Sequence, residues 1–510
     1  MKVRDDLDDE TSRSAVPLTL STASKTEIAI QCLQRLSVPF LSHQSTNWTD
    51  NTAASNTRVP YTPSLLVYAE TVQHVQDVVT CGVTAGLKVS ARGGGHSYAS
   101  FGLGGEDDHL IVDLTNLNSI NVNPSTNIAT VGAGARLGDV ASGLYNQGGR
   151  AISHGSCPAV GISGHILHGG YGWVSHNKGL ALDWLIGAGV VLANGTHVHC
   201  SETEHADLFW ALRGAGSNFG IVTSYELKTF AAPTVSIPYS VRLDWTREEQ
   251  KINGVRELVE YARTMPSDLN MRFTGYLVKK ITTDPGDLLV NMHNSGGHTF
   301  DGAYYGNVED LSTILAPLLR KTGGTLIAKP GTWIQGLEAY AEHNSLTPST
   351  TDRGSFYATS LTLKDLTGKS LTNFVRYWNN TALNFTQGGW FVQLDLHGGP
   401  TSAITAVPNS ATAYAHRDKA FLIQLYHYHD SNEPYPSGGI ELLRGWIDCT
   451  TESLQEGDWG MYINYVDSQL DRVTAQKLYY GENLDRLKLL KKRYDPTEVF
   501  YYPQSIEPAK

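Results

Sequence analysis

Hydrophobic residues recur at helical spacing near the start of the chain and alternate with polar residues in its middle. Valines at positions 72, 75, 79 and 83 share one helical face, which predicts a helix over residues 71–86. A second helix is predicted over residues 25–36, and a strand is predicted over residues 87–91, directly after the first helix. Farther along, β-forming residues predict strands of an antiparallel sheet at 270–279, 356–363, 389–397 and 421–429. Amphipathic stretches predict two covering helices, at 248–265 and 307–322.

Composition narrows the class of protein. The 510 residues can bury a large core and predict two domains, and contents of 41% hydrophobic and 17% charged residues are typical of a globular protein. A net charge of −11 without a long basic run argues against nucleic acid as a partner. No membrane span is predicted, because no segment reaches about 18 apolar residues; the nearest, 182–193, is interrupted by Asp183.

Two glycine-rich segments each contain a potential nucleophile. Residues 91–98 read ARGGGHSY and carry His96, and residues 153–172 read SHGSCPAVGISGHILHGGYG and carry Cys157. Glycine allows backbone N–H groups to approach a pyrophosphate closely. Imidazole and thiolate are the side chains best able to attack the electrophilic edge of a flavin. The pair therefore predicts a flavin that is both cradled by backbone and covalently attached.

The order of these segments resembles a known family. Residues 207–222 (DLFWALRGAGSNFGIV) and the C-terminal run 479–506 complete a pattern similar to the berberine-bridge-enzyme-like branch of the vanillyl-alcohol oxidase superfamily. Within that branch the chain most resembles the secreted fungal oligosaccharide oxidases, through the runs GGEDDHLIVDL (104–114), LDWLIGAGVVLA (182–193), SETEHADLFWALRG (201–214) and TAYAHRD (412–418). The resemblance implies an α+β fold of two domains: a PCMH-type FAD-binding domain of residues 1–230 and 459–510, and a substrate domain of residues 231–458 with a helix-covered antiparallel sheet.

The resemblance also implies the cofactor contacts. FAD would be linked through its C8α methyl to His96 and through C6 to Cys157. His165 matches the histidine that donates to the flavin's pyrimidine edge, whereas His168 stands where relatives more often have glycine and is expected to make a local hydrogen bond. Val160 accompanies dioxygen access in this branch and favours an oxidase. The remaining expected contacts are Arg92, Gly93, Gly94, Gly95, Ser97, Gly161, Gly164, Gly169, Gly170, Gly172 and Ile221.

A base and a sugar site are expected in the second half of the chain. Tyr465 occupies what resembles the family's base position, with Tyr462 as its nearest rival, and Asp395 is its expected partner. Strand alternation puts Phe391, Gln393 and Asp395 on one face. By resemblance the sugar contacts are Tyr98, Tyr171, Arg272, Phe391 and Gln393. Thr274 departs from the acidic residue of a glucose-type relative, which leaves gluco- and xylo-oligosaccharides both open.

These observations predict an oxidase that converts the reducing-end C1 hydroxyl of an oligosaccharide to a lactone and reduces O2 to H2O2. The same cofactor could instead serve a secondary-metabolite alcohol or alkaloid, and a non-catalytic flavoprotein is a third hypothesis. Glycines at 132–138 and 214–220 nearly match a dinucleotide fingerprint, but each has one residue too many in its second gap. His197, His199 and His205 around Cys200 could ligate a metal, yet they fit a polar strand edge better, so no metal is expected.

The cysteines and the N-terminus bear on the compartment. The first residues lack the apolar stretch of a secretory signal, so either the signal has been removed or the protein is intracellular. Sequons at Asn47, Asn194, Asn379 and Asn384 favour secretion. The resemblance implies a Cys32–Cys81 disulfide and leaves Cys200 and Cys449 unassigned. We expect an extracellular glycoprotein that is a monomer.

Overall fold

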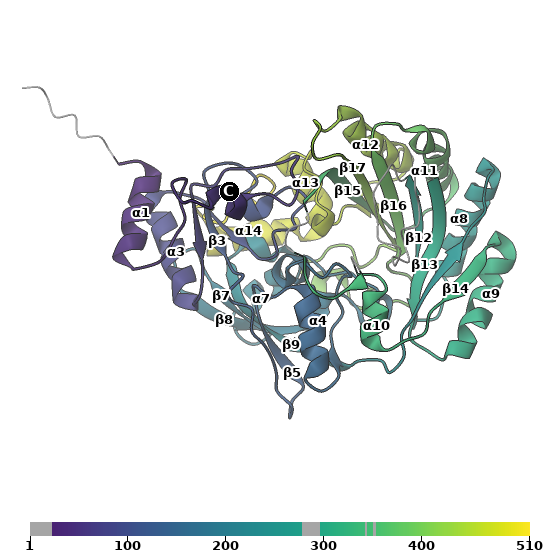
Figure 1. Cartoon of the computed structure of the whole chain (residues 1–510), viewed down its shortest axis with the longest axis horizontal. Helices are drawn as coiled ribbons and strands as arrows, with labels where there is room; N and C mark the ends of the chain where they lie inside the picture. The colour runs from purple at the N-terminus through teal and green to yellow at the C-terminus, as the bar shows by residue number, and fades with distance from the viewer. Residues whose placement is uncertain (1–22, 278–295, 342–343, 350–352) are drawn as a thin grey trace, which may run out of the picture.

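The computed structural model describes residues 23–277, 296–341, 344–349 and 353–510, arranged as two halves that face each other (Figure 1). The first half contains two sheets. A parallel sheet has the order β1-β3-β2, and a sheet of antiparallel pairs has the order β4-β5-β9-β7-β8. Their strands are β1 (Leu65–Tyr68), β2 (Val89–Arg92), β3 (Leu110–Asp113), β4 (Ile120–Val122), β5 (Ile128–Gly132), β7 (Leu185–Val191), β8 (His197–Ser201) and β9 (Ile221–Lys228). A short pair, β6 (Arg150–Ala151) and β10 (Phe230–Ala231), lies beside them.

Two predicted helices open the described chain and are confirmed. Helix α1 spans Lys25–Arg35 and α3 spans Val72–Ala85. The Thr71 hydroxyl caps the start of α3, and Gly86 ends it at φ 65°, a conformation that favours glycine. Val83, which the spacing places on the apolar face of this helix, is instead 47% exposed. The remaining helices of this half are α2 (Trp48–Thr52), α4 (Leu137–Asn146), α5 (Ile162–Ile166), α6 (Ser175–Lys178) and α7 (Ala206–Ala215).

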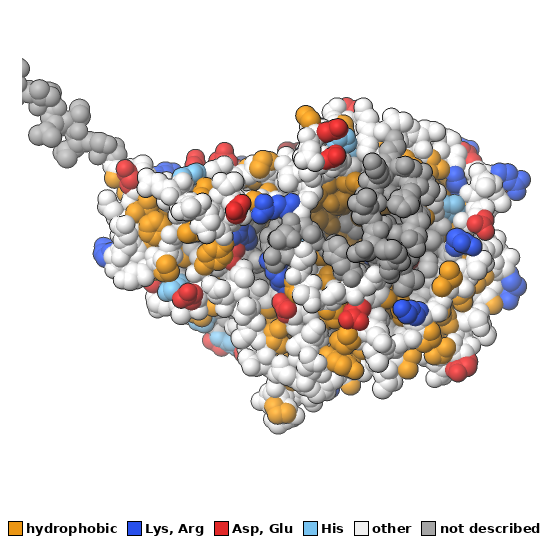
Figure 2. Space-filling model, viewed as in Figure 1, with side chains coloured by type: hydrophobic (Ala, Val, Ile, Leu, Met, Phe, Trp, Pro, Cys, Tyr) orange, Lys and Arg blue, Asp and Glu red, His pale blue; other side chains and the backbone are white. Residues whose placement is uncertain are grey.

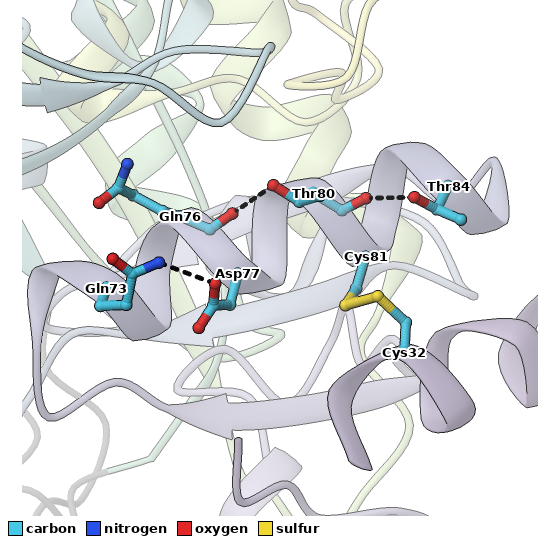
Figure 3. Close-up of a disulfide and its surroundings, with 7 residues drawn as sticks. All are labelled: Cys32, Gln73, Gln76, Asp77, Thr80, Cys81 and Thr84. Carbon is cyan, nitrogen blue, oxygen red and sulfur yellow. Dashed lines mark hydrogen bonds between the residues drawn. A yellow bond between two sulfur atoms is a disulfide. The ribbon is translucent and has the colours of Figure 1, made fainter. Parts of the chain in front are cut away.

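A disulfide joins these two helices. Cys32 on α1 and Cys81 on α3 form it across a Cα–Cα distance of 5.5 Å, as expected from the family resemblance (Figure 3). Along α3 the hydroxyl of Thr80 donates to the Gln76 carbonyl at 2.8 Å, which adds a side-chain bond to the helix ladder. The disulfide fixes α1 against the parallel sheet that leads to the first glycine-rich segment.

Removal of this disulfide is expected to weaken the fold. The two cysteines are 49 positions apart, so opening the cross-link should lower the free energy of unfolding by about 3–4 kcal/mol in the chain-entropy model. Denaturant unfolding of Cys32→Ala should show this loss, whereas Cys449→Ser, outside the disulfide, should cost much less. Equal stability of Cys32→Ala and the unchanged protein would contradict the prediction.

The second half is built on an eight-stranded antiparallel sheet. Its order is β14-β11-β13-β12-β16-β17-β15-β18. The strands are β11 (Ile237–Arg242), β12 (Leu269–Leu277), β13 (Gly296–Tyr304), β14 (Thr325–Ala328), β15 (Ser355–Leu363), β16 (Gly389–Leu396), β17 (Phe421–His429) and β18 (Trp459–Gly460). The four predicted strands are thus confirmed; the last two residues of the prediction 270–279 lie outside the described part.

Helices cover the outer face of this sheet, and its inner face is turned to the first half (Figure 1). The covering helices are α8 (Glu248–Ala262), α9 (Leu311–Thr322), α11 (Gly368–Asn380) and α12 (Ser437–Thr451). Strand β16 shows how side chains divide between these two faces. Trp390 is fully buried and packs against Trp446 of α12, with ring centroids 5.5 Å apart. Phe391 and Gln393 consequently face inward, because side chains alternate along a strand.

The C-terminal segment returns to the first half, as the resemblance implies. After β18, helices α13 (Arg472–Tyr480) and α14 (Leu484–Tyr494) lead back to it. The buried Lys491 ammonium donates to the Asn218 carbonyl at 2.7 Å and pairs with Asp495 at 2.6 Å. Strand β18 still belongs to the eight-stranded sheet, so the sheet extends two residues past the predicted limit at 458.

Surface and helix lengths add two observations. On the face in Figure 2, lysine and arginine side chains are scattered among aspartate and glutamate. In the described ranges, none of the helices combines the length and apolarity that crossing a membrane requires.

Candidate active site

A cavity of about 1390 Å³ lies between the two halves. The first half lines it with both glycine-rich segments, so that His96 and Cys157 face the same space. The sheet lines it with side chains from the inner face, and the C-terminal segment adds Phe500, Tyr501 and Tyr502. Among the predicted cofactor contacts, those that line it are Gly93, Gly94, Gly95, His96, Ser97, Cys157, Gly161, Gly164, His165 and Ile221.

The two glycine-rich segments touch backbone to backbone. A Cβ on Gly94 would stand 2.2 Å from the Gly161 nitrogen, and a Cβ on Gly161 would stand 2.2 Å from the Gly94 nitrogen. Any larger residue at either position would therefore push the segments apart. Arg136 holds the junction from behind, donating to the carbonyl of Gly94 at 3.0 Å and to that of Ala159. Two touching glycine segments, each followed or preceded by a nucleophile (His96 or Cys157), fit a dinucleotide cofactor that is attached twice.

Four predicted cofactor contacts lie outside the residues that line the cavity. Arg92 is ion-paired with Asp113 and donates to the Asn51 carbonyl at 2.7 Å, so its guanidinium is held by these two residues although its side chain passes beside Gly95 of the glycine loop. Gly169, Gly170 and Gly172 support the wall from behind. The Gly170 N–H donates to the Tyr462 hydroxyl at 2.9 Å, and a Cβ on Gly172 would stand 1.7 Å from the His154 carbonyl oxygen. Close packing explains these glycines.

His165 is a neutral hydrogen-bond donor at the cavity wall. The Gly155 N–H donates to Nε2 of His165 at 2.9 Å, which assigns the ring proton of the neutral imidazole to Nδ1. Burial lowers the pKa of His165 to about 3. His165 therefore presents a donor without a positive charge across the neutral pH range. His168, as expected, makes local bonds instead, to the Gly164 carbonyl at 3.0 Å and the Ser217 hydroxyl at 2.9 Å.

Buried and half-buried histidines predict that the protein loses stability in acid. Burial lowers their pKa values to about 3 for His165 and His416, and to about 4 for His168, His176, His298, His397 and His427. Unfolded histidines titrate near pKa 6.5. Below that pH the unfolded state binds protons that the folded state does not, so each histidine costs up to about 1.4 kcal/mol per pH unit.

The melting temperature should therefore fall steeply as the pH is lowered from 7 to 4. Circular dichroism melts at fixed ionic strength would test this. A melting temperature that stays constant between pH 7 and pH 4 would contradict the expected histidine effect.

The sheet side of the cavity combines aromatic rings and amides. Phe391 and Gln393, two predicted sugar contacts, line it from the sheet, and Tyr98, a third, lines it from the first glycine-rich segment. The Phe391 ring stacks on Tyr426, with centroids 4.8 Å apart and ring planes 7° apart. Tyr98 stacks on Tyr465 with centroids 6.1 Å and planes 9° apart, and its hydroxyl accepts a bond from Gln424 at 2.8 Å.

Asp395 lies behind this lining in a buried polar network. Its Oδ1 accepts from Arg272 Nε at 2.8 Å and from the Tyr171 hydroxyl at 3.3 Å. Arg272 is further fixed by Trp173, since its guanidinium carbon lies 4.2 Å from the centre of that ring. Neither Arg272 nor Tyr171 lines the cavity. The described residues offer no donor to Asp395 Oδ2, which is buried.

The electrostatics of Tyr465 and Asp395 are linked. Burial and the Asp395 charge hold the pKa of the Tyr465 phenol well above its ordinary value, against the effect of Arg272. Burial likewise raises the pKa of Asp395, opposed by Arg272. The hydroxyl of Tyr462 is already engaged in hydrogen bonds, because its oxygen accepts from Gly170 N at 2.9 Å and from Asn464 Nδ2 at 2.9 Å. Tyr465 thus faces the cavity, while Tyr462 fastens the second glycine-rich segment.

Several lining residues escaped the sequence analysis. Ser217 and Gly220 lie in residues 207–222, which carry the family resemblance but from which only Ile221 is expected as a cofactor contact. Tyr426 follows the alternation of the predicted strand 421–429 and could have been found from it. Asp301, Ser240 and Thr299 come from β11 and β13, for which no strand had been predicted.

The remaining cysteines and the histidine cluster take no part in the cavity. Cys200 is buried and Cys449 half-buried, and burial raises their pKa values to about 12 and about 11. His199 pairs with Glu204 at 2.9 Å and Glu226 at 3.4 Å on the edge of β8. Within the ranges that the structure covers, no group of three or more His, Cys, Asp or Glu side chains could hold a metal ion.

Comparison with known proteins agrees with this geometry. Residues 63–201 match the model of an FAD binding domain, and residues 461–507 match that of the berberine and berberine-like family. A xylooligosaccharide oxidase of Thermothelomyces thermophilus is 44% identical over 98% of both chains. The carbohydrate oxidase of Microdochium nivale, solved with a substrate analogue, superposes with a TM-score of 0.88 at 42% identity, covering 95% of this chain and 100% of that one.

A third relative bears on the cofactor. The solved glucooligosaccharide oxidase of Acremonium strictum, described with a 6-S-cysteinyl, 8α-N1-histidyl FAD, has a TM-score of 0.87 at 39% identity, with coverage of 94% and 99%. The fold is the two-domain α+β fold of these enzymes. The chain therefore belongs to the berberine-like family of FAD-linked oxidases, in the group that contains the fungal oligosaccharide oxidases.

Proposed function

We propose that this protein oxidises the reducing-end C1 hydroxyl of gluco- or xylo-oligosaccharides to the lactone and reduces O2 to H2O2. One observation carries the proposal: a single cavity is lined by the two nucleophiles His96 and Cys157 on one side and by Tyr465, Gln393 and an aromatic wall on the other. The similarity to enzymes that act on xylo- and glucooligosaccharides supports the substrate class.

The proposal includes FAD attached through both His96 and Cys157. When bound, FAD supplies a hydride acceptor and a route for electrons to O2. The chain's own contribution begins with the close approach of Gly94 and Gly161, which brings the two glycine-rich segments together so that both line the cavity. His165 then offers an uncharged N–H, which suits a ring that becomes negative when reduced.

Tyr465 is proposed as the base for the C1 hydroxyl. A phenol with a raised pKa is protonated at neutral pH, so it can accept a substrate proton only as it gives up its own. Asp395 is the proposed receiver of that proton, because its raised pKa and its unpartnered Oδ2 both favour protonation. Arg272 and Tyr171, predicted as sugar contacts, are better described as positioning residues that hold Asp395.

Sugar recognition is assigned to the lining itself. Tyr98 and Phe391 supply aromatic rings, Tyr426 is stacked between Phe391 and Phe356 and supports them, and Gln393 offers a planar amide for hydroxyl groups. This combination matches the alternating apolar faces and polar edges of pyranose rings. The planar amide of Gln393 suits an oligosaccharide, whose rings carry many hydroxyl groups, better than an alkaloid, whose rings carry few.

Anaerobic bleaching of the flavin absorbance against a substrate panel tests the proposed function. Cellobiose, xylobiose and their longer oligomers should bleach it, whereas aromatic and terpenoid alcohols should not. Bleaching by the alcohols alone would favour the alternative function, oxidation of a secondary metabolite. Readmission of air should restore the absorbance if O2 is the acceptor.

We further propose that the protein acts outside the cell as a glycosylated monomer. The Cys32–Cys81 disulfide is typical of oxidising compartments. Asn47, Asn194 and Asn384 are exposed, whereas Asn379 is half-buried and therefore less suited to carry a glycan. The monomeric state stays a prediction.

A further inference from the structure

The inner face of the eight-stranded sheet carries three parallel rows of side chains across its strands. The pairing register puts Tyr276, Phe391 and Tyr426 opposite one another on β12, β16 and β17. A second row, nearer the base, places Asp301, Arg272 and Asp395 opposite one another on β13, β12 and β16. Between them lies a third row of Thr299, Thr274 and Gln393. The rows run perpendicular to the strands.

These rows define a direction for a sugar chain. An oligosaccharide presents ring faces to aromatic groups and hydroxyl edges to polar groups. A chain lying across the strands would keep its rings beside the aromatic row, whose members Phe391 and Tyr426 stack on each other, and its hydroxyl edges against the polar rows. It would then extend from Phe391 and Gln393, near the base, toward Tyr276 and the strand that carries Asp301.

Asp301 is an unusual group at the far end of this path. It lines the cavity although it is only 1% exposed. Its Oδ1 accepts from the Ser240 hydroxyl at 2.7 Å and its Oδ2 from the Thr299 hydroxyl at 2.6 Å. Two hydroxyl donors leave each carboxylate oxygen with a further lone pair. Its register neighbour Arg272 is turned to Asp395 and Trp173 instead, so no cation of the described chain forms an ion pair with Asp301.

The position of Asp301 matches the second sugar from the reducing end. It lies two strands from Asp395 in the same row, which is roughly 10 Å at the usual strand spacing. That span is about the length of a disaccharide. Tyr276 lies on the adjacent strand β12, two rows away from Asp301, and would lie beneath the same sugar ring.

We propose that Asp301, fixed by Ser240 and Thr299 and faced by Tyr276, is a subsite for the second sugar that selects for hydrogen-bond donors. The subsite accepts neutral hydroxyls, binds the ammonium of an unacetylated amino sugar more tightly, and disfavours uronic acids. This inference rests on the proposed function and extends it, because it makes the distal ring a determinant of specificity.

Binding of unreactive glycosides tests the subsite apart from the chemistry. Methyl glucoside and methyl cellobioside lack a free C1 hydroxyl, so calorimetry on the flavin-loaded protein measures binding alone. Asp301→Asn should raise the Kd of methyl cellobioside about 10-fold, the lower range for a lost hydrogen bond to a charged group, and leave that of methyl glucoside within about twofold. Asp310→Asn, an exposed aspartate outside the cavity, is the matched control and should change neither.

A second measurement needs no variant. The unchanged protein should bind methyl cellobioside with an amino group at C2 of its distal ring more tightly than methyl cellobioside itself. Equal or weaker binding of the amino sugar would overturn the inference, as would equal losses for mono- and disaccharide in Asp301→Asn. Failure of the proposed function would look different, since the unchanged protein would then oxidise no free sugar at all.

Discussion

Replacement of Tyr465 by phenylalanine should slow anaerobic flavin reduction by an oligosaccharide at least about 100-fold, the lower end of general-base effects. The reason is that the variant keeps the ring that stacks on Tyr98 but has no oxygen to receive the C1 hydroxyl proton. Substrate binding should change much less than the reduction rate. Stopped-flow spectroscopy measures both, since the dependence of the rate on sugar concentration separates binding from reduction.

The rival tyrosine supplies the matched control. Tyr462→Phe removes the acceptor of the Gly170 N–H and of Asn464, so it should lower the melting temperature while reducing its flavin far faster than Tyr465→Phe. If Tyr465→Phe reduces its flavin at nearly the unchanged rate, Tyr465 is not the base, and Tyr462 or Asp395 must be tested in that role.

Loss of both tethers should release the flavin, whereas loss of one should not. Protein precipitated by acid should remain yellow in the unchanged chain, in His96→Ala and in Cys157→Ala, because either residue alone can hold the cofactor. The double variant should lose its flavin completely. Absorbance of the supernatant and mass spectrometry of the flavin peptides measure the outcome.

Variants outside the attachment provide the comparison. Cys200→Ala removes a buried thiol away from the cavity and should keep both links. Full release of flavin from the unchanged protein by acid would contradict covalent attachment altogether. If acid releases flavin from Cys157→Ala but not from the unchanged protein or from His96→Ala, then the flavin has a single covalent link, through Cys157.

The sequence predicts on which face of a strand a side chain lies better than it predicts how deeply that side chain is buried. Alternation in 389–397 correctly put Phe391, Gln393 and Asp395 on one face, since a strand has only two faces. It could not show that Phe391 and Gln393 reach the cavity while Asp395 is buried behind it, because that depends on how Tyr171 and Trp173 from the other half pack there. Arg272 is expected at the sugar by resemblance alone, and the sequence could not show that it pairs with Asp395.

Residues with weak local patterns were missed. Strand β13 begins with Gly296 and Gly297, and Asp301 stands between Phe300 and Gly302, so its sequence gives no clear alternation. Arg92 shows the opposite error: it adjoins the glycine loop in sequence, but its strand directs the side chain toward Asp113 on the neighbouring β3. The path of the C-terminal segment back to the first half could be expected only by resemblance, because no local signal encodes a contact between Lys491 and Asn218.

The stoichiometry of a single reaction tests the central claim most directly. Purified protein, one oligosaccharide and a known amount of O2 should yield one H2O2 and one lactone, recovered as the aldonic acid, for each O2 consumed. Cellobiose and xylobiose are the first substrates to try, with methyl cellobioside as the unreactive control. Peroxide formation without the aldonic acid, or oxidation of methyl cellobioside as fast as cellobiose, would contradict oxidation at C1.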